Sequence, residues 1–279
     1  MMLVRKAEAY IRVRRSIALL PRRFDVSRRM LPTLIILGAQ RGGTTSLFHY
    51  VTQHPQVQRA VTKEIHYFDL NFSKGLSWYR AHFPRVSHGL MTLDVSPYYI
   101  FHPEVPRRLK AVLPEAKFVV LLRNPVERSH SHYWHMVKRG YERLSFSAAL
   151  AEEDNRLRGE TERLQANARY VSFTHRNYSY LSRGFYAEQI ERWFESFSPE
   201  QFLFIKSETF FADPAAETGR VFHFLNLDGH VCIHDRIFNK NHYGAMDPST
   251  HHALTKYYRP FNRRLAELLG QDITWDEEK

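Results

Sequence analysis

The chain has a single cysteine and no long apolar run. Cys232 stands alone among 279 residues, so no disulfide can form within the chain, and a reducing compartment is the simplest expectation. No apolar stretch approaches the roughly 18–20 residues that cross a bilayer. The first residues also lack the apolar core and cleavage site of a secretory signal. We therefore expect a cytoplasmic protein.

Acidic residues are scarce near the N-terminus. Residues 1–30 hold nine Lys or Arg against Glu8 and Asp25, a net charge of +7, which leaves +4 for the other 249 residues. Such a segment can form a basic amphipathic helix that touches anionic lipid or another subunit, or a solvated extension. Both interpretations stay open. We expect residues 1–30 to be a basic extension able to contact a membrane peripherally, and residues 31–279 to form one domain.

Short apolar runs alternate with helical patterns along the rest of the chain. Strands are predicted at 34–37, 91–93, 118–122 and 202–205, and helices from 44 to about 54 and over 104–113, 126–138, 146–164 and 186–197. The stronger strand runs are apolar throughout, as parallel strands covered on both faces are. This alternation predicts an α/β, P-loop-like three-layer fold with a mainly parallel central sheet and helices on both faces. The polar segment 140–182 is expected to be an insertion over the sheet that forms a substrate-side lid.

A glycine-rich turn, Gly38 to Ser46, follows the first predicted strand. Its sequence GAQRGGTTS has the spacing of the nucleotide P-loop, but Thr44 stands where that loop has lysine. The P-loop lysine reaches the β- and γ-phosphates of ATP, whereas here the cation is Arg41, inside the loop. What remains is a nest of backbone N–H groups at a helix N-terminus, which suits a single 5′-phosphate. A structural strand–helix turn is the alternative.

A second anion site is predicted after the strand 118–122. Arg123 closes this strand, Asn124-Pro125 turns the chain, and Ser131 lies about two turns into the next helix. Ligands of open α/β sheets bind at the carboxyl ends of strands, so Arg123 should face the same crevice as the glycine-rich turn. Its guanidinium matches phosphate oxygens. Two separate anion sites fit a nucleotide bisphosphate better than a triphosphate, although a surface ion pair would also explain Arg123.

Metal ions and nucleic acids are not expected partners. The chain has sixteen histidines, and three of them, His130, His132 and His135, share one predicted helix. No two of these are four residues apart, as the ligands of a zinc helix are. No nucleic-acid-binding motif is recognisable either.

Several motifs, in order along the chain, resemble the heparan sulfate sulfotransferases. They lie at residues 40–45, 63–69, 74–80, 123–131, 184–187 and 257–262. The resemblance extends over about residues 33–275. It implies that residues 31–279 form a sulfotransferase domain whose donor is 3′-phosphoadenosine 5′-phosphosulfate (PAPS) and whose donor product is adenosine 3′,5′-bisphosphate. We also expect no metal, and we expect a small-molecule or glycan acceptor, in the first place a hydroxyl (or amine) of a carbohydrate or glycolipid.

The resemblance also implies roles for single residues. The 5′-phosphosulfate end of PAPS would be bound by Arg41, Gly42, Gly43, Thr44, Thr45 and Ser46. Arg123 and Ser131 would bind the 3′-phosphate. The loop around residues 241–244, with Tyr243 and Gly244, would close over the donor. Glu64 falls where the 3-O-sulfotransferases place their catalytic base.

Two positions depart from the family pattern. The family usually has lysine where this chain has Arg41, which can neutralise charge on the leaving phosphate but, with a pKa above about 12, is a poor proton donor. The heparan enzymes also have a lysine between the acid and Ser-Pro, whereas this chain reads Asp94-Val95-Ser96-Pro97. The acceptor therefore stays open among oligosaccharides, glycolipids, polyketides and other small alcohols, and so does the choice between O- and N-sulfation.

Sulfo transfer needs a group that removes the acceptor proton. We predict Glu64 for this role, with His66 and Asp94 as nearby candidates, and we expect both carboxylates to face one crevice. A small-molecule kinase on the same fold is one alternative, although the missing P-loop lysine argues against it. A non-enzymatic binder of anionic glycan or lipid is another, but it leaves the two anion motifs without a purpose.

Overall fold

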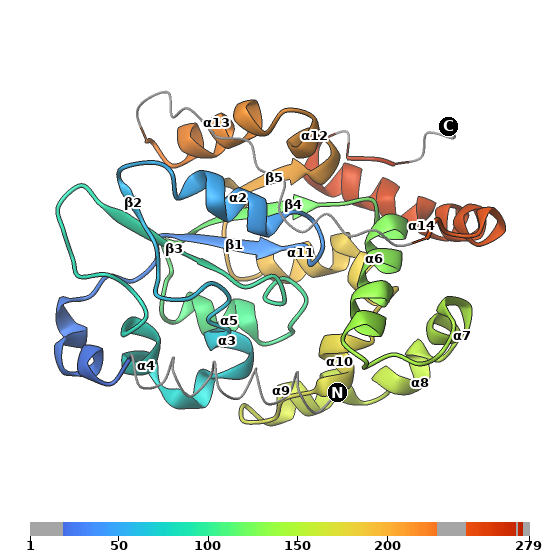
Figure 1. Ribbon diagram of the computed structural model, residues 1–279, viewed down its shortest axis with the longest axis horizontal. Helices are drawn as coiled ribbons and strands as arrows, with labels where there is room; N and C mark the ends of the chain where they lie inside the picture. Colours follow the sequence, from blue (N-terminus) through green and yellow to red (C-terminus); the bar gives the residue numbers. More distant parts are fainter. Residues whose placement is uncertain (1–18, 228–243, 272, 276–279) are drawn as a thin grey trace.

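A five-stranded parallel sheet forms the centre of the molecule (Figure 1). The computed structural model describes residues 19–227, 244–271 and 273–275. The strands are β1 (Leu34–Gly38), β2 (Val57–Gln58), β3 (Met91–Val95), β4 (Lys117–Leu122) and β5 (Phe202–Lys206). Their order is β2-β3-β1-β4-β5, and every neighbouring pair is parallel. The four predicted strands are confirmed; β2 was missed because two residues carry no periodicity.

Helices cover both faces of the sheet, because successive strand residues point to opposite sides. Leu34 and Ile36 of β1 pack towards α2 (Thr44–Val51), α12 (Ser207–Ala212) and α13 (Pro214–Phe224). Ile35 and Leu37 belong to the cluster on the other face. The helices that contribute to that cluster include α3 (Tyr67–Leu70), α4 (Leu76–Arg80), α5 (Val105–Lys110) and α11 (Tyr186–Phe194). The predicted three-layer α/β fold is confirmed (Figure 1).

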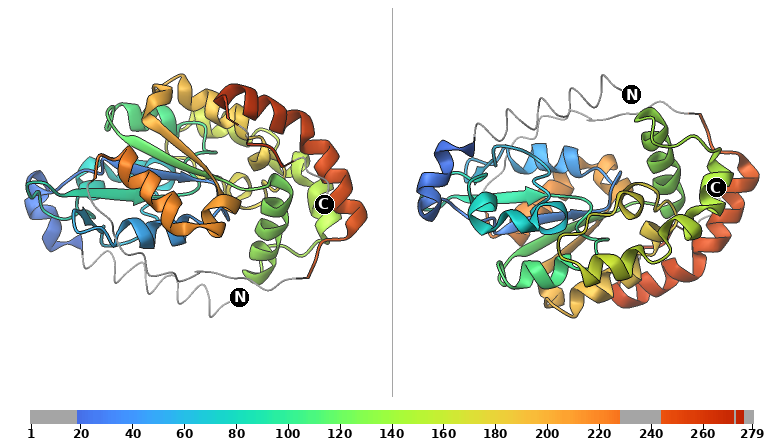
Figure 2. Two further views of the ribbon diagram at one scale, coloured as in Figure 1. Left: turned by 90° about the horizontal axis from the view of Figure 1, so that it is seen from above. Right: turned by 90° about the horizontal axis from the view of Figure 1, so that it is seen from below.

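Further helices lie beyond the carboxyl ends of the strands (Figures 1 and 2). They are α6 (Pro125–Lys138), α7 (Phe146–Ala151), α8 (Glu153–Leu157) and α14 (Pro248–Leu269). The single helix predicted over 146–164 is wrong: the chain forms α7, α8 and α9 (Glu160–Ala166) instead. Arg158 has an extended ψ of 120° and Gly159 a left-handed φ of 74°, and neither conformation continues a helix. Next comes α10 (Phe173–Asn177).

The 3-10 helix η1 (Pro21–Arg28) packs on the end of the molecule opposite α6 (Figure 2). Arg22 donates to the carbonyls of Ala81 and Phe83, and Arg29 also donates to Phe83 O. Residues 19–30 are therefore attached to the body, while most of the basic extension, residues 1–18, lies outside the described residues. The division at residue 30 stays a prediction.

Three shorter 3-10 helices complete the described elements: η2 (Phe72–Lys74), η3 (Ser182–Gly184) and η4 (Pro199–Gln201). None of the helices within the described ranges combines the length and the apolar character needed to cross a membrane.

Candidate active site

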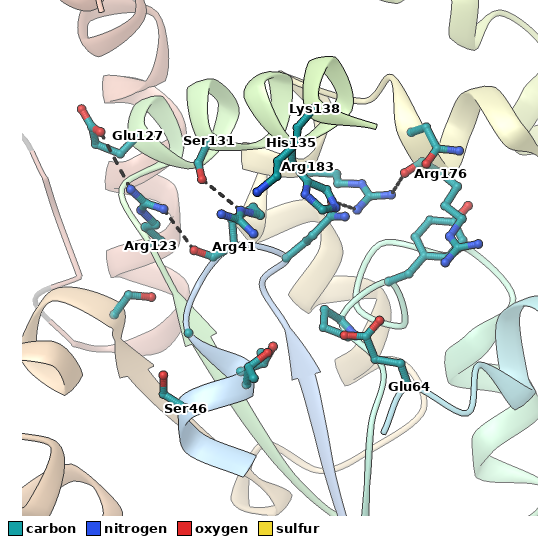
Figure 3. A pocket seen from close by; sticks show the side chains of 18 of the residues that line it. Arg41, Ser46, Glu64, Arg123, Glu127, Ser131, His135, Lys138, Arg176 and Arg183 are labelled. Carbon is teal, nitrogen blue, oxygen red and sulfur yellow. Dashed lines mark hydrogen bonds and ion pairs between the residues drawn. The ribbon is translucent and has the colours of Figure 1, made fainter. Parts of the chain in front are cut away.

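A pocket of about 1040 Å³ lies where β1, β3, β4 and β5 end (Figure 3). This is the edge at which open α/β sheets bind ligands. Nine of the residues expected in the site line it: Arg41, Gly43, Thr44, Thr45, Ser46, Glu64, His66, Arg123 and Ser131. The sheet thus brings together segments that are far apart in the sequence.

The glycine-rich turn presents an open helix N-terminus to the pocket. Gly43, with a left-handed φ of 102°, precedes α2, and no side chain caps the first turn. A Cβ on Gly42 would lie 2.9 Å from Ala39 O, so only glycine fits there. Ser207 Oγ donates to Gly42 O at 2.7 Å and holds the turn against β5. Ser46 Oγ is buried without a hydrogen-bond partner. Free N–H groups and a free hydroxyl at a positive helix end form a site for an anion.

Arg41 and Arg123 connect this turn to α6. Arg41 Nε donates to Ser131 Oγ at 3.0 Å, and Arg123 Nη1 donates to Arg41 O at 3.1 Å. Arg123 also lies 3.9 Å from a carboxylate oxygen of Glu127 (Figure 3). The predicted proximity of Arg123, Ser131 and the glycine-rich turn is confirmed. Their binding of phosphate stays a prediction.

Glu64 lies across the pocket from α6, in a chain of charged groups (Figure 3). Its carboxylate is 2.9 Å from Lys63 Nζ and 3.6 Å from His66 Nε2. His66 Nδ1 is 2.7 Å from the buried carboxylate of Asp69. The side chain of Glu64 is 44% exposed, whereas that of His66 is 11% exposed. Of the two carboxylates among these charged groups, that of Glu64 is therefore the one that faces the pocket.

Neighbouring charges shift the pKa values of Glu64 and His66. Burial raises the pKa of Glu64, but the hydrogen bond to His66 and the positive charges of Lys63 and His66 outweigh burial and lower it. Burial lowers the pKa of His66, but Asp69 and Glu64 outweigh it and raise the value to about 9. At neutral pH His66 is therefore an imidazolium that cannot accept a proton, and Glu64 is an ionised carboxylate that can.

Asp94 does not face the pocket, so its predicted place beside Glu64 in one crevice is wrong. It lies within β3, which runs to Val95, and the residue is 2% exposed. Tyr79, Tyr99 and Ser96 all donate to its carboxylate. Burial outweighs these hydrogen bonds and raises the pKa of Asp94 to about 6. These bonds hold Asp94 inside the layer of the sheet.

The loop expected to close over the donor is only partly described. Tyr243 lies outside the described residues. Gly244 is exposed and does not line the pocket, and Gly42 lies behind the turn rather than in its wall. In the ranges that the structure describes, no three His, Cys, Asp or Glu side chains gather as metal ligands.

Backbone conformation singles out the same positions. Arg41, Glu64 and His66 have φ values of 73°, 58° and 53°. Among the described non-glycine residues only Asn226 shares such a φ, which costs about 1–3 kcal/mol at most positions. Arg41, Glu64 and His66 all line the pocket. Strained backbone concentrated in one pocket is typical of a functional site.

Sequence reasoning missed several polar residues of the pocket. The segment 140–182 contributes Arg176 and Asn177, which confirms its place beside the pocket, whereas a lid function stays a prediction. Lys138 and Arg139 line the wall at the end of α6. Arg183 donates to Gln40 in the turn. Asp69, which contacts His66 but does not line the pocket, was also missed. Its spacing of three residues from His66 could have indicated this contact.

The family model described as "Sulfotransferase domain" matches residues 31–264. The chain belongs to this family. It is 31% identical over 286 residues to human heparan sulfate glucosamine 3-O-sulfotransferase 6, covering 92% of this chain and 77% of that one. It is also 31% identical to human heparan sulfate glucosamine 3-O-sulfotransferase 3A1, of which it spans 64%.

A solved bacterial enzyme shares the fold of this sulfotransferase. The crystal structure of a sulfotransferase from Alicyclobacillus acidocaldarius matches with a TM-score of 0.72 and 28% identity, over 87% of this chain and 97% of that one. The resemblance drawn from the sequence motifs is confirmed. Membership of an enzyme family also sets aside the kinase and the non-enzymatic binder, and the chain is a sulfotransferase.

Proposed function

We propose that this sulfotransferase moves the sulfo group of PAPS to a hydroxyl of a negatively charged carbohydrate. One observation carries the donor assignment: a single pocket holds an open helix N-terminus and, separately, the Arg41–Ser131–Arg123 cluster. Two anion sites suit the two phosphate positions of PAPS. The 5′-phosphosulfate would lie at the first turn of α2, and the 3′-phosphate beside Arg123 and Ser131.

The reaction follows from these positions. The acceptor oxygen forms a bond to sulfur while the bond from sulfur to the bridging phosphate oxygen breaks. The electron pair stays on the phosphate, and adenosine 3′,5′-bisphosphate leaves. The acceptor proton passes to Glu64, an ionised carboxylate that lines the pocket. The N–H groups of α2 stabilise the charge that grows on this phosphate, whereas the Arg41 guanidinium lies beside Ser131.

The charge of the pocket favours an anionic acceptor. Six Lys or Arg line it against three Glu. Arg41 and Arg123 belong to the two predicted donor motifs, whereas Lys138, Arg139 and Arg176 line the pocket outside those motifs. Arg176 Nη2 is 3.4 Å from His66 Nε2, and His66 is the neighbour of the candidate base Glu64. The two human relatives are named for heparan sulfate glucosamine, an anionic carbohydrate, and this supports the same chemical class here.

Donor and acceptor can be tested separately. Adenosine 3′,5′-bisphosphate should raise the thermal unfolding temperature, because a ligand bound only to the native state stabilises it by mass action. ATP with Mg²⁺ should raise it much less, since Thr44 replaces the P-loop lysine. Equal stabilisation by ATP would contradict the donor assignment.

For the acceptor, transfer of radiolabelled sulfate from PAPS should be measured on carbohydrates that differ in charge. The panel would hold a carboxylated oligosaccharide, its uncharged counterpart, a glycolipid and a simple alcohol. We expect the carboxylated member to be preferred, through a lower KM that rises with salt. A preference for the uncharged members would contradict the anionic acceptor and leave the donor assignment intact.

A further inference from the structure

The ammonium group of Lys63 lies between the glycine-rich turn and the candidate base. Lys63 Nζ donates to Thr45 Oγ1 at 2.8 Å and to Glu64 Oε1 at 2.9 Å. Its side chain is 20% exposed. The backbone N–H of Glu64 donates to Val95 O at 3.1 Å, which fixes this segment beside the end of β3. Lys63 therefore contacts Thr45, a residue of the proposed donor site, and Glu64, the proposed general base.

The position of this cation is electrostatically unusual. Thr45 lies in the first turn of α2, whose uncapped N-terminus carries a partial positive charge. A cation beside a positive helix end is unfavourable unless an anion accompanies it. Glu64 supplies one negative charge, but its carboxylate also faces His66, a second cation. The local charge thus favours another anion at the start of α2.

The cation in the turn itself is directed elsewhere. Arg41 Nε donates to Ser131 on α6, on the opposite wall of the pocket. Thr44 occupies the place at which a nucleotide P-loop has its lysine. Lys63 comes from the segment before α3 and brings an ammonium group to the first turn of α2 from outside the turn.

We propose that Lys63 is a donor-binding residue whose ammonium contacts the 5′-phosphate of the donor and links that phosphate to Glu64. This inference rests on PAPS as the donor. The bound phosphate takes the place of Thr45 Oγ1 as a partner of Lys63 Nζ, between the helix N-terminus and the ammonium. Both positive groups then face the anion, and the unfavourable pairing of cation and helix end is removed.

Lys63 consequently acts on the leaving phosphate and on the general base. As the bond between sulfur and the bridging oxygen breaks, its ammonium stabilises the electron pair left on the phosphate. Because the bound phosphate shares the positive charge of this ammonium, Lys63 stabilises the ionised form of Glu64 less, and Glu64 becomes a stronger base for the acceptor proton. Donor binding therefore prepares the carboxylate for proton transfer.

The test compares two ligands that differ only in the 5′-phosphate. The affinities of adenosine 3′,5′-bisphosphate and adenosine 3′-monophosphate are measured by calorimetry, and their ratio reports the contribution of the 5′-phosphate. Lys63→Met should reduce this ratio about tenfold or more, as expected for a lost hydrogen bond to a charged group. Lys63→Arg should keep most of it. Lys256→Met removes the same charge from exposed α14, outside the pocket, and should leave the ratio unchanged.

The two ways of failing are distinct. A wild-type ratio near one would contradict PAPS as the donor. A large wild-type ratio that Lys63→Met leaves unchanged would overturn the role of Lys63 alone. Thermal unfolding shows whether each variant is folded before titration, and Lys63→Gln provides a second neutral side chain with a polar end.

Discussion

Glu64 is an ionised carboxylate with a cation on each side. Lys63 and His66 keep it deprotonated, but the same charges make it a weak base. Asp69 holds His66 in its charged form and so maintains the arrangement. The resting site therefore suits proton transfer only when a cation turns away from Glu64 or when an incoming anion competes for it.

Replacing Glu64 by Gln should lower turnover by roughly 10²–10⁴-fold, the usual contribution of a general base. The amide keeps the size of the side chain but cannot accept the proton. The affinity for adenosine 3′,5′-bisphosphate should change much less than turnover, because Glu64 is coupled to the proposed phosphate site only through Lys63. Turnover and affinity are measured in the same preparation.

Asp94→Asn and His66→Ala are the matched controls for this experiment. Asp94 is buried away from the pocket. Asp94→Asn should therefore lower the stability of the protein, while the folded fraction keeps most of its turnover. His66→Ala should weaken turnover less than Glu64→Gln. Near-normal turnover of Glu64→Gln together with the collapse of one control would assign the base to that other residue.

The raised pKa of His66 makes a prediction about stability and pH. Its imidazolium is favoured in the folded state, with a pKa of about 9 against 6.5 unfolded. The resulting stabilisation is fully present below pH 6.5 and disappears as pH rises through 9. The stability advantage of wild type over His66→Gln, measured by urea unfolding, should shrink over this range by about 3 kcal/mol at most.

His88→Gln is the control, because His88 is exposed. Its stability difference from wild type should stay nearly constant over the same pH range. An advantage of His66 that grows with pH would show that the imidazole is neutral in the folded protein and would remove the charged chain from Asp69 to Glu64.

At the scale of elements, the junction of β4 and α6 builds the second anion site. The strand ends at Leu122, Asn124 caps α6 by accepting from Val126 N, and Arg123 is left between them at the edge of the sheet. Two turns later the helix returns Ser131 to the same pocket. The regular geometry of one strand and one helix therefore places both side chains.

Arg123→Ala should weaken the binding of adenosine 3′,5′-bisphosphate by roughly 1.5–3 kcal/mol, the scale of a hydrogen bond to a charged group. Part of the loss would come from the glycine-rich turn, since Arg123 also holds Arg41 O. Titration calorimetry measures the change. Arg264→Ala, an exposed arginine of α14 paired with Glu191, should bind the ligand as wild type does. Unchanged affinity in Arg123→Ala would exclude it from the donor site.

At the scale of the whole molecule, the helix η1 and the pocket lie at different ends. The helix η1 is attached through Arg22 and Arg29 at the end opposite α6 (Figure 2). Its surface includes exposed Phe24 and Arg23. Contact of this end with a membrane, like a cytoplasmic location, stays a prediction.

Deleting residues 1–18 should leave sulfo transfer to a soluble acceptor largely unchanged, because all pocket residues lie between 40 and 211. The deletion stops before Leu19, which is 4% exposed, and so spares the packed part of the extension. Binding to anionic vesicles should fall and should weaken with salt, whereas neutral vesicles serve as the control. Full-length protein that ignores anionic vesicles would exclude the membrane contact.

The sequence by itself determined the sheet, its layers and the two anion motifs. Apolar strands such as 34–37 and 118–122 are signals confined to a few neighbouring residues, and so are the glycines of the turn. Because strand ends of a parallel sheet meet at one edge, Arg41, Arg123 and Ser131 were placed together without coordinates. The family followed from the same motifs.

Only the tertiary structure decided how the charged side chains pair. Asp94 and Glu64 look alike as carboxylates after strands, yet β3 extends far enough to bury the first, while a left-handed turn directs the second into the pocket. Lys63 reaches Thr45, and Arg176 reaches His66, across gaps of 18 and 110 residues. Local patterns carry no information about such distant pairs, because burial and the charge of neighbours, which set each group's protonation, arise only when the chain has folded.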